Sequence, residues 1–233
     1  MVGARAPGGW RLDAVSIAGI AVFSALATLL AAVSQVLGLN FPIVPYLQFD
    51  FGEIAIFIAF FIFGPVPALV SSCVEAVALE AFGQNLPYGP VLKLFALVSS
   101  IAGLWLGTVI AARTSNPGLG KAMGWGAVVG SAVRAAVLTI PNYYLLIFVF
   151  GLSPIVGYVK GGFALVGINL TDGNALALIL TFTAIFNVMQ LAFASVLAYS
   201  VLRVPLFSNM KVGGRPPWFA SVRSRVAPEN TKG

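Results

Sequence analysis

Charged residues are scarce in this chain. Only 9% of its 233 residues are Asp, Glu, Lys or Arg, whereas 59% are hydrophobic. A water-soluble domain usually has about 25% charged residues. A chain with so little charge could not cover a surface that faces water. We therefore expect an integral membrane protein whose outer surface faces lipid, and not a soluble protein with one large core.

Histidine is absent, and cysteine occurs only once. Cys73 lies inside an apolar segment, so we expect neither a disulfide framework nor a thiolate metal site. Without histidine, the chain lacks the usual proton shuttle and the commonest metal ligand. The segment "GLGKA" (118–122) lacks the spacing and the Ser or Thr of a nucleotide-binding loop. We expect no catalytic residues, no metal, no cofactor and no enzymatic activity.

Six apolar segments are present, and crossing a bilayer takes roughly 20 apolar residues in a helix. Their apolar runs are continuous rather than alternating, which favours helices over barrel strands. The predicted fold is an all-α membrane protein with six transmembrane helices. "FGPVP" (63–67) separates the second segment from the third, so this pair could form a hairpin of short helices or a re-entrant loop. The segments are Ala14–Leu37, Phe51–Phe63, Val66–Phe82, Leu92–Ala112, Met123–Phe150 and Ala175–Leu202.

The basic residues predict the orientation, because Lys and Arg are retained on the cytoplasmic side. With six spans, ten of them share one side, and the other side keeps only Lys93 and Lys160 near its surface. Both termini are therefore expected in the cytoplasm of a multi-pass cell-membrane protein. A nucleic-acid partner is not expected, because the basic tail lacks interleaved aromatic residues. The ten are Arg5, Arg11, Arg113, Lys121, Arg203, Lys211, Arg215, Arg223, Arg225 and Lys232.

The chain reads as one membrane domain, residues 13–205, between a cytoplasmic arm, residues 1–12, and a cytoplasmic tail, residues 206–233. Two outer loops, Gly38–Asp50 and Gly151–Asn174, are long and have no obvious structure of their own. Loops of this kind are often binding loops or lids. We expect the tail to be mobile.

A few charged side chains lie within or at the ends of the apolar segments. Glu75 and Arg134 are near the middle of the third and fifth segments. An unpaired charge there costs at least about 2.5–3.5 kcal/mol. We expect them to form an ion pair that joins two helices or to contact a ligand. Glu80 and Lys93 lie near the outer ends, where they could extend to the interface, and Lys93 is also a candidate ligand contact.

Three amides lie in the outer halves of the last two segments. Asn142 follows Pro141, and Asn187 and Gln190 are three residues apart, hence on one helical face. Amides offer donors and acceptors, which suits a neutral heterocycle. The alternative is hydrogen bonding between helices. We expect a ligand pocket.

"FPIVPYLQFDFGEIAIFIAFFIFGPVPALVSS" (41–72) resembles the N-terminal signature of the S components of energy-coupling-factor (ECF) vitamin transporters. "IAVFSALATLL" (20–30) resembles the Ala-xxx-Ala motif of their first helix, with Ala21 and Ala25 in the motif positions. The similarity covers most of residues 14–203. It implies that Asp50 and Glu53 lie at the outer mouth, where acids near a helix start cap free N–H groups and fix the first loop over the pocket.

The riboflavin-specific members look most similar. They carry an Asn-Tyr pair in the fifth helix, matched by Asn142 and Tyr143, and an "FN-x-x-K" motif in the sixth, matched by Phe186 and Asn187. Gln190 stands where that motif has Lys, and Lys93 stands where a neutral residue is expected. The substrate-binding residues expected from the resemblance and the polar pattern are Tyr46, Glu75, Lys93, Asn142, Tyr143, Asn187 and Gln190.

The resemblance implies a substrate-capture subunit that binds riboflavin with high affinity. Two partner ATPases would drive transport through a membrane T component, which would dock on Ala21 and Ala25, and the subunit would topple in the membrane to release its vitamin. The alternatives are an S component for another vitamin or small heterocycle, an autonomous carrier or channel, and a membrane enzyme. A carrier would need a polar path and usually internal repeats, and an enzyme would need clustered His or acidic residues; none of these is evident.

Overall fold

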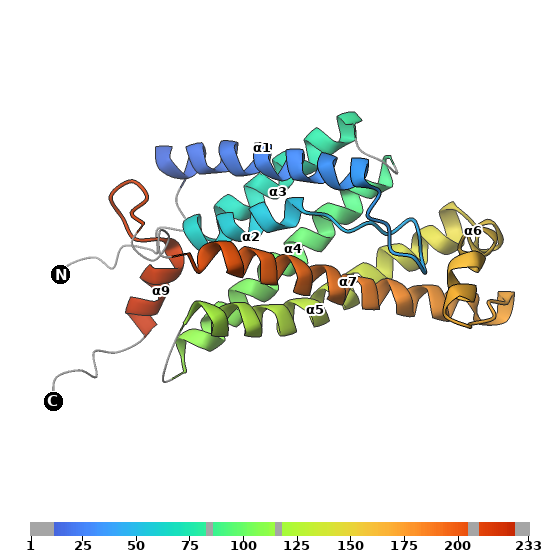
Figure 1. Cartoon of the computed structure of the whole chain (residues 1–233). Helices are drawn as coiled ribbons and strands as arrows, with labels where there is room; N and C mark the ends of the chain where they lie inside the picture. Colours follow the sequence, from blue (N-terminus) through green and yellow to red (C-terminus); the bar gives the residue numbers. More distant parts are fainter. Residues whose placement is uncertain (1–11, 83–85, 115–117, 205–209, 227–233) are drawn as a thin grey trace.

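The computed structural model describes residues 12–82, 86–114, 118–204 and 210–226, which form helices and no β-strand (Figure 1). Four of the described helical segments are long and apolar enough to cross a membrane: α1, α4, α5 with η2, and α7. The helices are α1 (Ala14–Leu37), α2 (Gly52–Phe63), α3 (Pro65–Phe82), α4 (Tyr88–Ala112), α5 (Leu119–Tyr144), the π-helical η2 (Leu145–Val149), α6 (Leu152–Leu165), α7 (Asp172–Leu202) and α9 (Trp218–Val226).

All six predicted apolar segments are helical, and the second and third form the expected pair of shorter helices. α2 has 12 residues, which at about 1.5 Å per residue is about 18 Å, well below the roughly 30 Å of the hydrocarbon layer. Gly64, at φ +103°, provides the sharp turn from α2 into α3, a backbone region that other residues rarely adopt.

α2 lies inside the bundle, and the longer helices surround it (Figure 1). It packs against α1, α3 and α7 and, at its C-terminal end, against α9. Its side chains are therefore buried on all sides; Phe57, Phe60 and Phe61 are at most 2% exposed. A helix that is apolar all round is expected to be buried in this way.

Among the helices that the structure describes, α4 and α5 have the most extensive contact of any pair. Glycines make this approach possible: a methyl group at Gly103 would overlap the backbone of Gly130, and one at Gly107 would overlap the backbone of Gly126. Both pairs have the Gly-xxx-Gly spacing that lets membrane helices come close. This tight contact fixes the position of Arg134, which lies one turn beyond Gly130 on α5.

Two segments differ from the prediction. The outer loop 151–174 contains α6, whose Val156, Val159 and Phe163 are buried at helical spacing against α7. The expectation of a structureless loop was wrong because this apolar face is too short to stand out as a span. The tail, expected to be mobile, contains α9: the ring centroids of Trp218 and Phe60 on α2 lie 5.1 Å apart.

The structure describes only part of the tail and of the N-terminal arm. Residues 1–11, 205–209 and 227–233 lie outside the described residues, so the predicted arm and the ends of the tail are not assessed. In the described part, Arg215 forms an ion pair with Asp13, the residue that caps the start of α1 by accepting a hydrogen bond of 2.9 Å from the Ser16 N–H.

Buried apolar side chains form two clusters that meet along α7. One surrounds α2 and includes Leu191, Ala194 and Ala198 of α7. The other joins α6 to the loop before α2 and includes Ala175, Ile179 and Phe186 of α7. Polar residues lie between the clusters: Asn187 and Gln190 follow Phe186 on α7 and are both buried. Asn187 lines the cavity described below.

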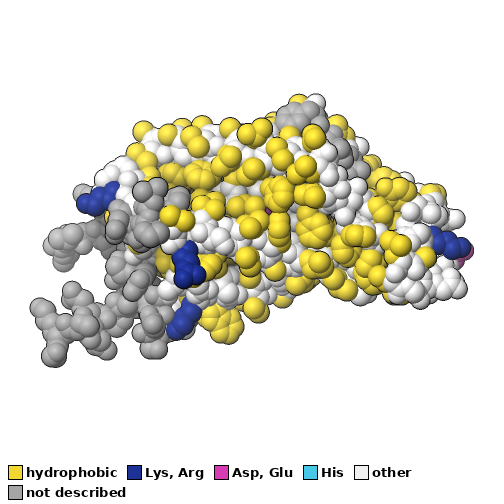
Figure 2. Space-filling model, viewed as in Figure 1, with side chains coloured by type: hydrophobic (Ala, Val, Ile, Leu, Met, Phe, Trp, Pro, Cys, Tyr) yellow, Lys and Arg dark blue, Asp and Glu magenta, His cyan; other side chains and the backbone are white. Residues whose placement is uncertain are grey.

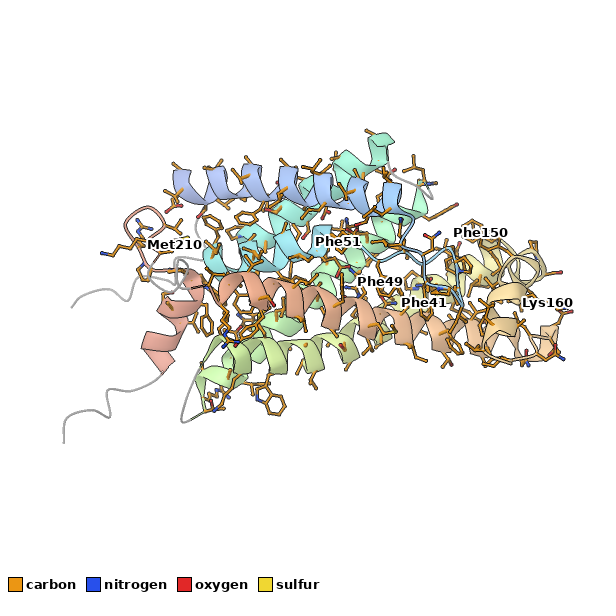
Figure 3. The ribbon with its side chains drawn as sticks, in the orientation of Figure 1. Phe41, Phe49, Phe51, Phe150, Lys160 and Met210 are labelled. Carbon is orange, nitrogen blue, oxygen red and sulfur yellow. The ribbon has the colours of Figure 1, made fainter. Side chains whose placement is uncertain are left out.

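The surface fits a protein surrounded by lipid. Figure 2 shows apolar side chains along the length of the bundle and basic ones gathered toward its two ends. Val22 and Ile140 are 62% and 73% exposed, and many other large apolar residues are also exposed. Lys160, on α6, lies at the end opposite α9 (Figure 3).

Candidate ligand-binding cavity

A cavity of about 580 Å³ is lined by Asn187 of α7 and by members of the second apolar cluster such as Leu146 and Phe186. The loop before α2, the first turns of α4, the end of α5 with η2, and residues of α6 and α7 enclose it. Its lining comprises Gln35, Tyr46, Leu47, Gln48, Asp50, Glu53, Leu79, Leu86, Tyr88, Gly89, Pro90, Leu92, Lys93, Ala96, Arg134, Leu138, Asn142, Leu145, Leu146, Phe150, Ile155, Tyr158, Phe186 and Asn187.

Arg134 is at the centre of the first of two charged groups in the cavity wall. Its two terminal nitrogens donate to the two carboxylate oxygens of Glu53 at 2.7 and 2.8 Å. Its Nε donates to Asn187 Oδ1 at 2.9 Å, and Nη1 also donates to Ser100 Oγ at 3.2 Å. The side chains of Arg134 and Glu53 are both only 3% exposed. These hydrogen bonds join α2, α4, α5 and α7 and give nearly every N–H donor of the Arg134 guanidinium a partner.

Lys93 is at the centre of the second group. Its ammonium contacts the carboxylate of Asp50 and lies 2.5 Å from Oε1 of Glu75. The other oxygen of Glu75 is buried and has no hydrogen-bond partner in the described part of the chain. Lys93 and Asp50 line the cavity, whereas Glu75 lies behind Lys93 and is not part of the lining. This group joins α3 and α4 to the loop before α2.

Asp50 attaches the end of the loop before α2 to the bundle through several hydrogen bonds. Its Oδ1 accepts a hydrogen bond of 2.6 Å from the Gly52 N–H at the start of α2. Gln190 donates from Nε2 to the Asp50 carbonyl at 2.8 Å and accepts from the Asp50 N–H at 3.3 Å. Ser34, near the end of α1, adds a further anchor, because its Oγ accepts from the Phe51 N–H at 2.9 Å.

Aromatic side chains form much of the remaining wall. Tyr88 and Phe150 pack edge to face with ring centroids 5.5 Å apart, and Tyr158 is 60% exposed at the rim. Phe186 backs the cavity and packs against Phe49, with ring centroids 5.1 Å apart. Figure 3 shows Phe49 near the start of α2 and Phe150 closer to α6.

Tyr46 contributes the most buried phenol of the cavity. Burial raises the pKa of Tyr46 to about 12, and the hydroxyl of Thr183 opposes part of that rise. The phenol therefore stays protonated at physiological pH and can donate a hydrogen bond. Asn142 adds an acceptor: its Nδ2 donates to the carbonyl of Leu138 at 2.8 Å, and its Oδ1 has no partner among the described residues.

The structure brings together four of the seven predicted substrate-binding residues in the cavity lining: Tyr46, Lys93, Asn142 and Asn187. Tyr143 is not among them, since it is 44% exposed on the outer surface of α5. Gln190 hydrogen-bonds the main chain of Asp50, and Glu75 lies behind Lys93. Whether any of these residues binds a substrate stays a prediction.

The predicted ion pair between Glu75 and Arg134 is wrong. Arg134 pairs with Glu53, and Glu75 pairs with Lys93. Depth along the segments suggested the first pairing, but the start of α2 lies in the middle of the bundle and brings Glu53 to Arg134. Asp50 does cap the start of α2, as expected, whereas Glu53 instead forms the ion pair.

Sequence reasoning missed the aromatic rim of the cavity and the partner of Arg134. Tyr88 and Tyr158 belong to parts of the chain that were predicted to be a span boundary and a loop, so no pattern connected them.

The signal for the α4–α5 contact was present: "GLWLG" (103–107) and "GAVVG" (126–130) are both Gly-xxx-Gly motifs.

Two further features bear on function. Ala21 and Ala25 are exposed on α1, and their predicted role in docking a partner stays a prediction. Among the residues that the structure describes, no group of three or more His, Cys, Asp or Glu side chains could hold a metal ion.

Comparison with known proteins gives one relevant relative. The chain is 29% identical over 129 residues to the riboflavin transporter RibU of Staphylococcus aureus (strain TCH60), and the aligned part covers 54% of this chain and 65% of RibU. The chain thus spans slightly less than two thirds of this relative. The similarity confirms the predicted resemblance to riboflavin-transport proteins, and this relative is a transporter rather than an enzyme. No family model matches the chain, and no solved structure matches it.

Proposed function

We propose that the protein is the substrate-capture subunit, or S component, of an ECF-type importer and that it binds riboflavin. The observation that carries this proposal is the cavity of about 580 Å³ with aromatic rings and amides in its wall, in a chain similar to a riboflavin transporter. Ligand sites are usually concave, largely apolar, roughly 300–1,000 Å³ in volume and equipped with a few polar groups.

The chemistry of the wall suits a flavin. A flavin ring system is flat and apolar on its faces, and its edge alternates donors and acceptors. Phe186 and Tyr46 can pack on the faces, and the free Oδ1 of Asn142 can accept a hydrogen bond from the edge. Each such hydrogen bond contributes about 0.5–1.5 kcal/mol, and more where its loss leaves a buried group unpaired.

The proposed topology has six spans with both termini in the cytoplasm. Exposed basic residues support this orientation: Arg113, Lys121 and Arg203 lie in or beside the α4–α5 connection and at the end of α7, the end of the bundle that carries α9. Lys160 lies at the opposite end, on α6, which contributes Ile155 and Tyr158 to the cavity lining. The cavity would then open toward the outside, where an importer has to capture its substrate.

The energy for transport would come from partners, because the chain carries no nucleotide-binding motif. A membrane T component would connect this subunit to two ATPases, and release would follow when the subunit topples in the membrane. The exposed small residues of α1, including Ala21 and Ala25, offer a smooth face for the T component, since small side chains let membrane helices approach closely.

The ligand proposal is tested by purifying the full chain in mild detergent and recording its absorption spectrum. We expect a flavin spectrum from protein made in cells supplied with riboflavin, and native mass spectrometry should give the mass of one riboflavin. A different bound vitamin would show that the ligand is wrong but leave the transport proposal standing.

The partner proposal is tested with bulky substitutions on α1. Ala21→Trp and Ala25→Trp should prevent co-purification with the T component and the ATPases while riboflavin binding persists. Leu26→Trp is the matched control, because Leu26 is also exposed but points about 100° or more away from both alanines around the helix. Normal assembly of both alanine variants would contradict docking at this face, and uptake without any ATPase would favour an autonomous carrier.

A further inference from the structure

The charges around the cavity do not balance. Four charged side chains line it: Asp50, Glu53, Lys93 and Arg134. A fifth, Glu75, contacts the ammonium of Lys93 from behind. Two cations thus face three carboxylates, which gives the wall a net charge of −1 when all five are ionised.

The excess negative charge belongs to the group around Lys93. Arg134 and Glu53 neutralise each other through two short hydrogen bonds. Lys93 is shared by two carboxylates, so one of them has no cation of its own. Glu75 is fully buried, and its Oε2 has no hydrogen-bond partner among the described residues. No charged group other than these five lines the cavity or pairs with its wall in the described part of the chain.

We propose that Glu75 determines the ligand charge that this cavity accepts: acting through Lys93, it keeps the wall net negative, so that the site takes a neutral flavin and rejects its phosphate ester. The inference rests on the proposed function, because it concerns the choice between riboflavin and riboflavin 5′-phosphate (FMN). Glu75 is a specificity-determining residue that works at a distance, since it does not line the cavity.

The physical reason is the competition for Lys93. Lys93 lines the cavity and carries three N–H donors, so a phosphate would ordinarily be attracted to it. With both Asp50 and Glu75 beside the ammonium, an incoming phosphate meets a net negative group instead. A phosphate monoester carries a charge of about −1.5 to −2 at pH 7. At an effective dielectric constant of about 20, one unit charge about 12 Å from another changes a Kd about tenfold.

The test is a pair of equilibrium titrations at pH 7.5 on the purified full chain, one with riboflavin and one with FMN, followed by quenching of flavin fluorescence. The measured quantity is the ratio of the Kd for FMN to the Kd for riboflavin. Glu75→Gln removes the excess charge with almost no change of shape, and we expect the ratio to fall about tenfold. Glu80→Gln is the matched control: it removes the same charge from an exposed position on the same helix, and the ratio should not change.

Asp50→Asn provides a second route to the same charge change if Glu75→Gln does not yield folded protein. Because Asp50 is only partly buried and Lys93 keeps Glu75 as a partner, this variant should fold, and its ratio should also fall. A ratio that stays at the wild-type value in the folded variants would overturn the inference while riboflavin binding still supports the proposed function. Absence of riboflavin binding in the wild type would overturn both.

Discussion

The two charged groups in the cavity wall contain similar residues but differ in how many partners each cation has and in how deeply the partners are buried. Arg134 has one carboxylate partner, Glu53, and two further hydrogen-bond acceptors, and the ion pair is almost completely buried. Lys93 has two carboxylate partners, one of which is partly exposed in a loop. The first group joins four helices, whereas the second attaches a loop to two helices beside the cavity.

This difference indicates how the fold separates stability from function. A buried ion pair with nearly all its hydrogen bonds made is costly to break, because the remaining partner keeps its charge without solvent. Lys93, with two carboxylate partners, can lose one of them and still form an ion pair with the other. We therefore interpret the Arg134 group as the structural centre of the bundle and the Lys93 group as the adjustable side of the site.

The largest expected effect comes from Glu53→Gln, which leaves the buried guanidinium of Arg134 without its carboxylate. Breaking a buried pair by removing one partner typically costs about 3–5 kcal/mol. The free energy of unfolding, measured by SDS titration in mixed micelles with helical circular dichroism, should fall by that amount. Arg134→Gln should cost a similar amount, and the double variant should cost less than the sum of the two. Additive losses would show that the pair does not form.

Asp50→Asn tests the other group and should have a much smaller effect. Lys93 retains Glu75, and the Asn side chain can still accept the hydrogen bond from the Gly52 N–H that caps α2. We expect the free energy of unfolding to fall by about 1 kcal/mol, the usual cost of one altered hydrogen bond. A loss as large as that of Glu53→Gln would contradict the distinction between the two groups.

The exposed ion pair between Arg215 and Asp13 should matter least. Their side chains are 72% and 39% exposed, and surface pairs contribute about 0–1 kcal/mol. Arg215→Gln should leave the free energy of unfolding within about 1 kcal/mol of the wild type. The hydrogen bond from the Ser16 N–H is the main cause of the lowered pKa of Asp13. The small stabilisation that ionised Asp13 provides is therefore present at neutral pH and is lost as the pH falls through this lowered pKa. A titration of the free energy of unfolding between neutral and acidic pH would detect the loss.

The sequence was sufficient for the membrane class and for the positions of six helices, because long apolar runs depend only on composition. It could not identify the partner of Arg134, since pairing depends on where the short α2 begins inside the bundle. It also missed α6 and α9: each is short, and each is stabilised by contacts with other helices, such as Trp218 with Phe60. Local sequence cannot predict contacts of this kind.

The candidate site was predictable in part for a similar reason. Polar residues in apolar segments are conspicuous, so Lys93, Asn142 and Asn187 were found, and all three line the cavity. Which way a helical side chain points depends on small rotations. Asn142 and Tyr143 are neighbours in the sequence, but only Asn142 is directed into the cavity, and Tyr143 lies on the outer surface.

Titration of riboflavin into the wild type, Asn142→Leu and Tyr143→Leu tests the central claim most directly, with flavin fluorescence as the readout. If the cavity is the flavin site, the wild type should bind at micromolar concentrations or below. Asn142→Leu should raise the Kd about tenfold or more, because about 1.4 kcal/mol corresponds to a factor of ten, and Tyr143→Leu should leave it unchanged. No binding by the wild type, or equal losses in the two variants, would contradict the assignment of this cavity to riboflavin.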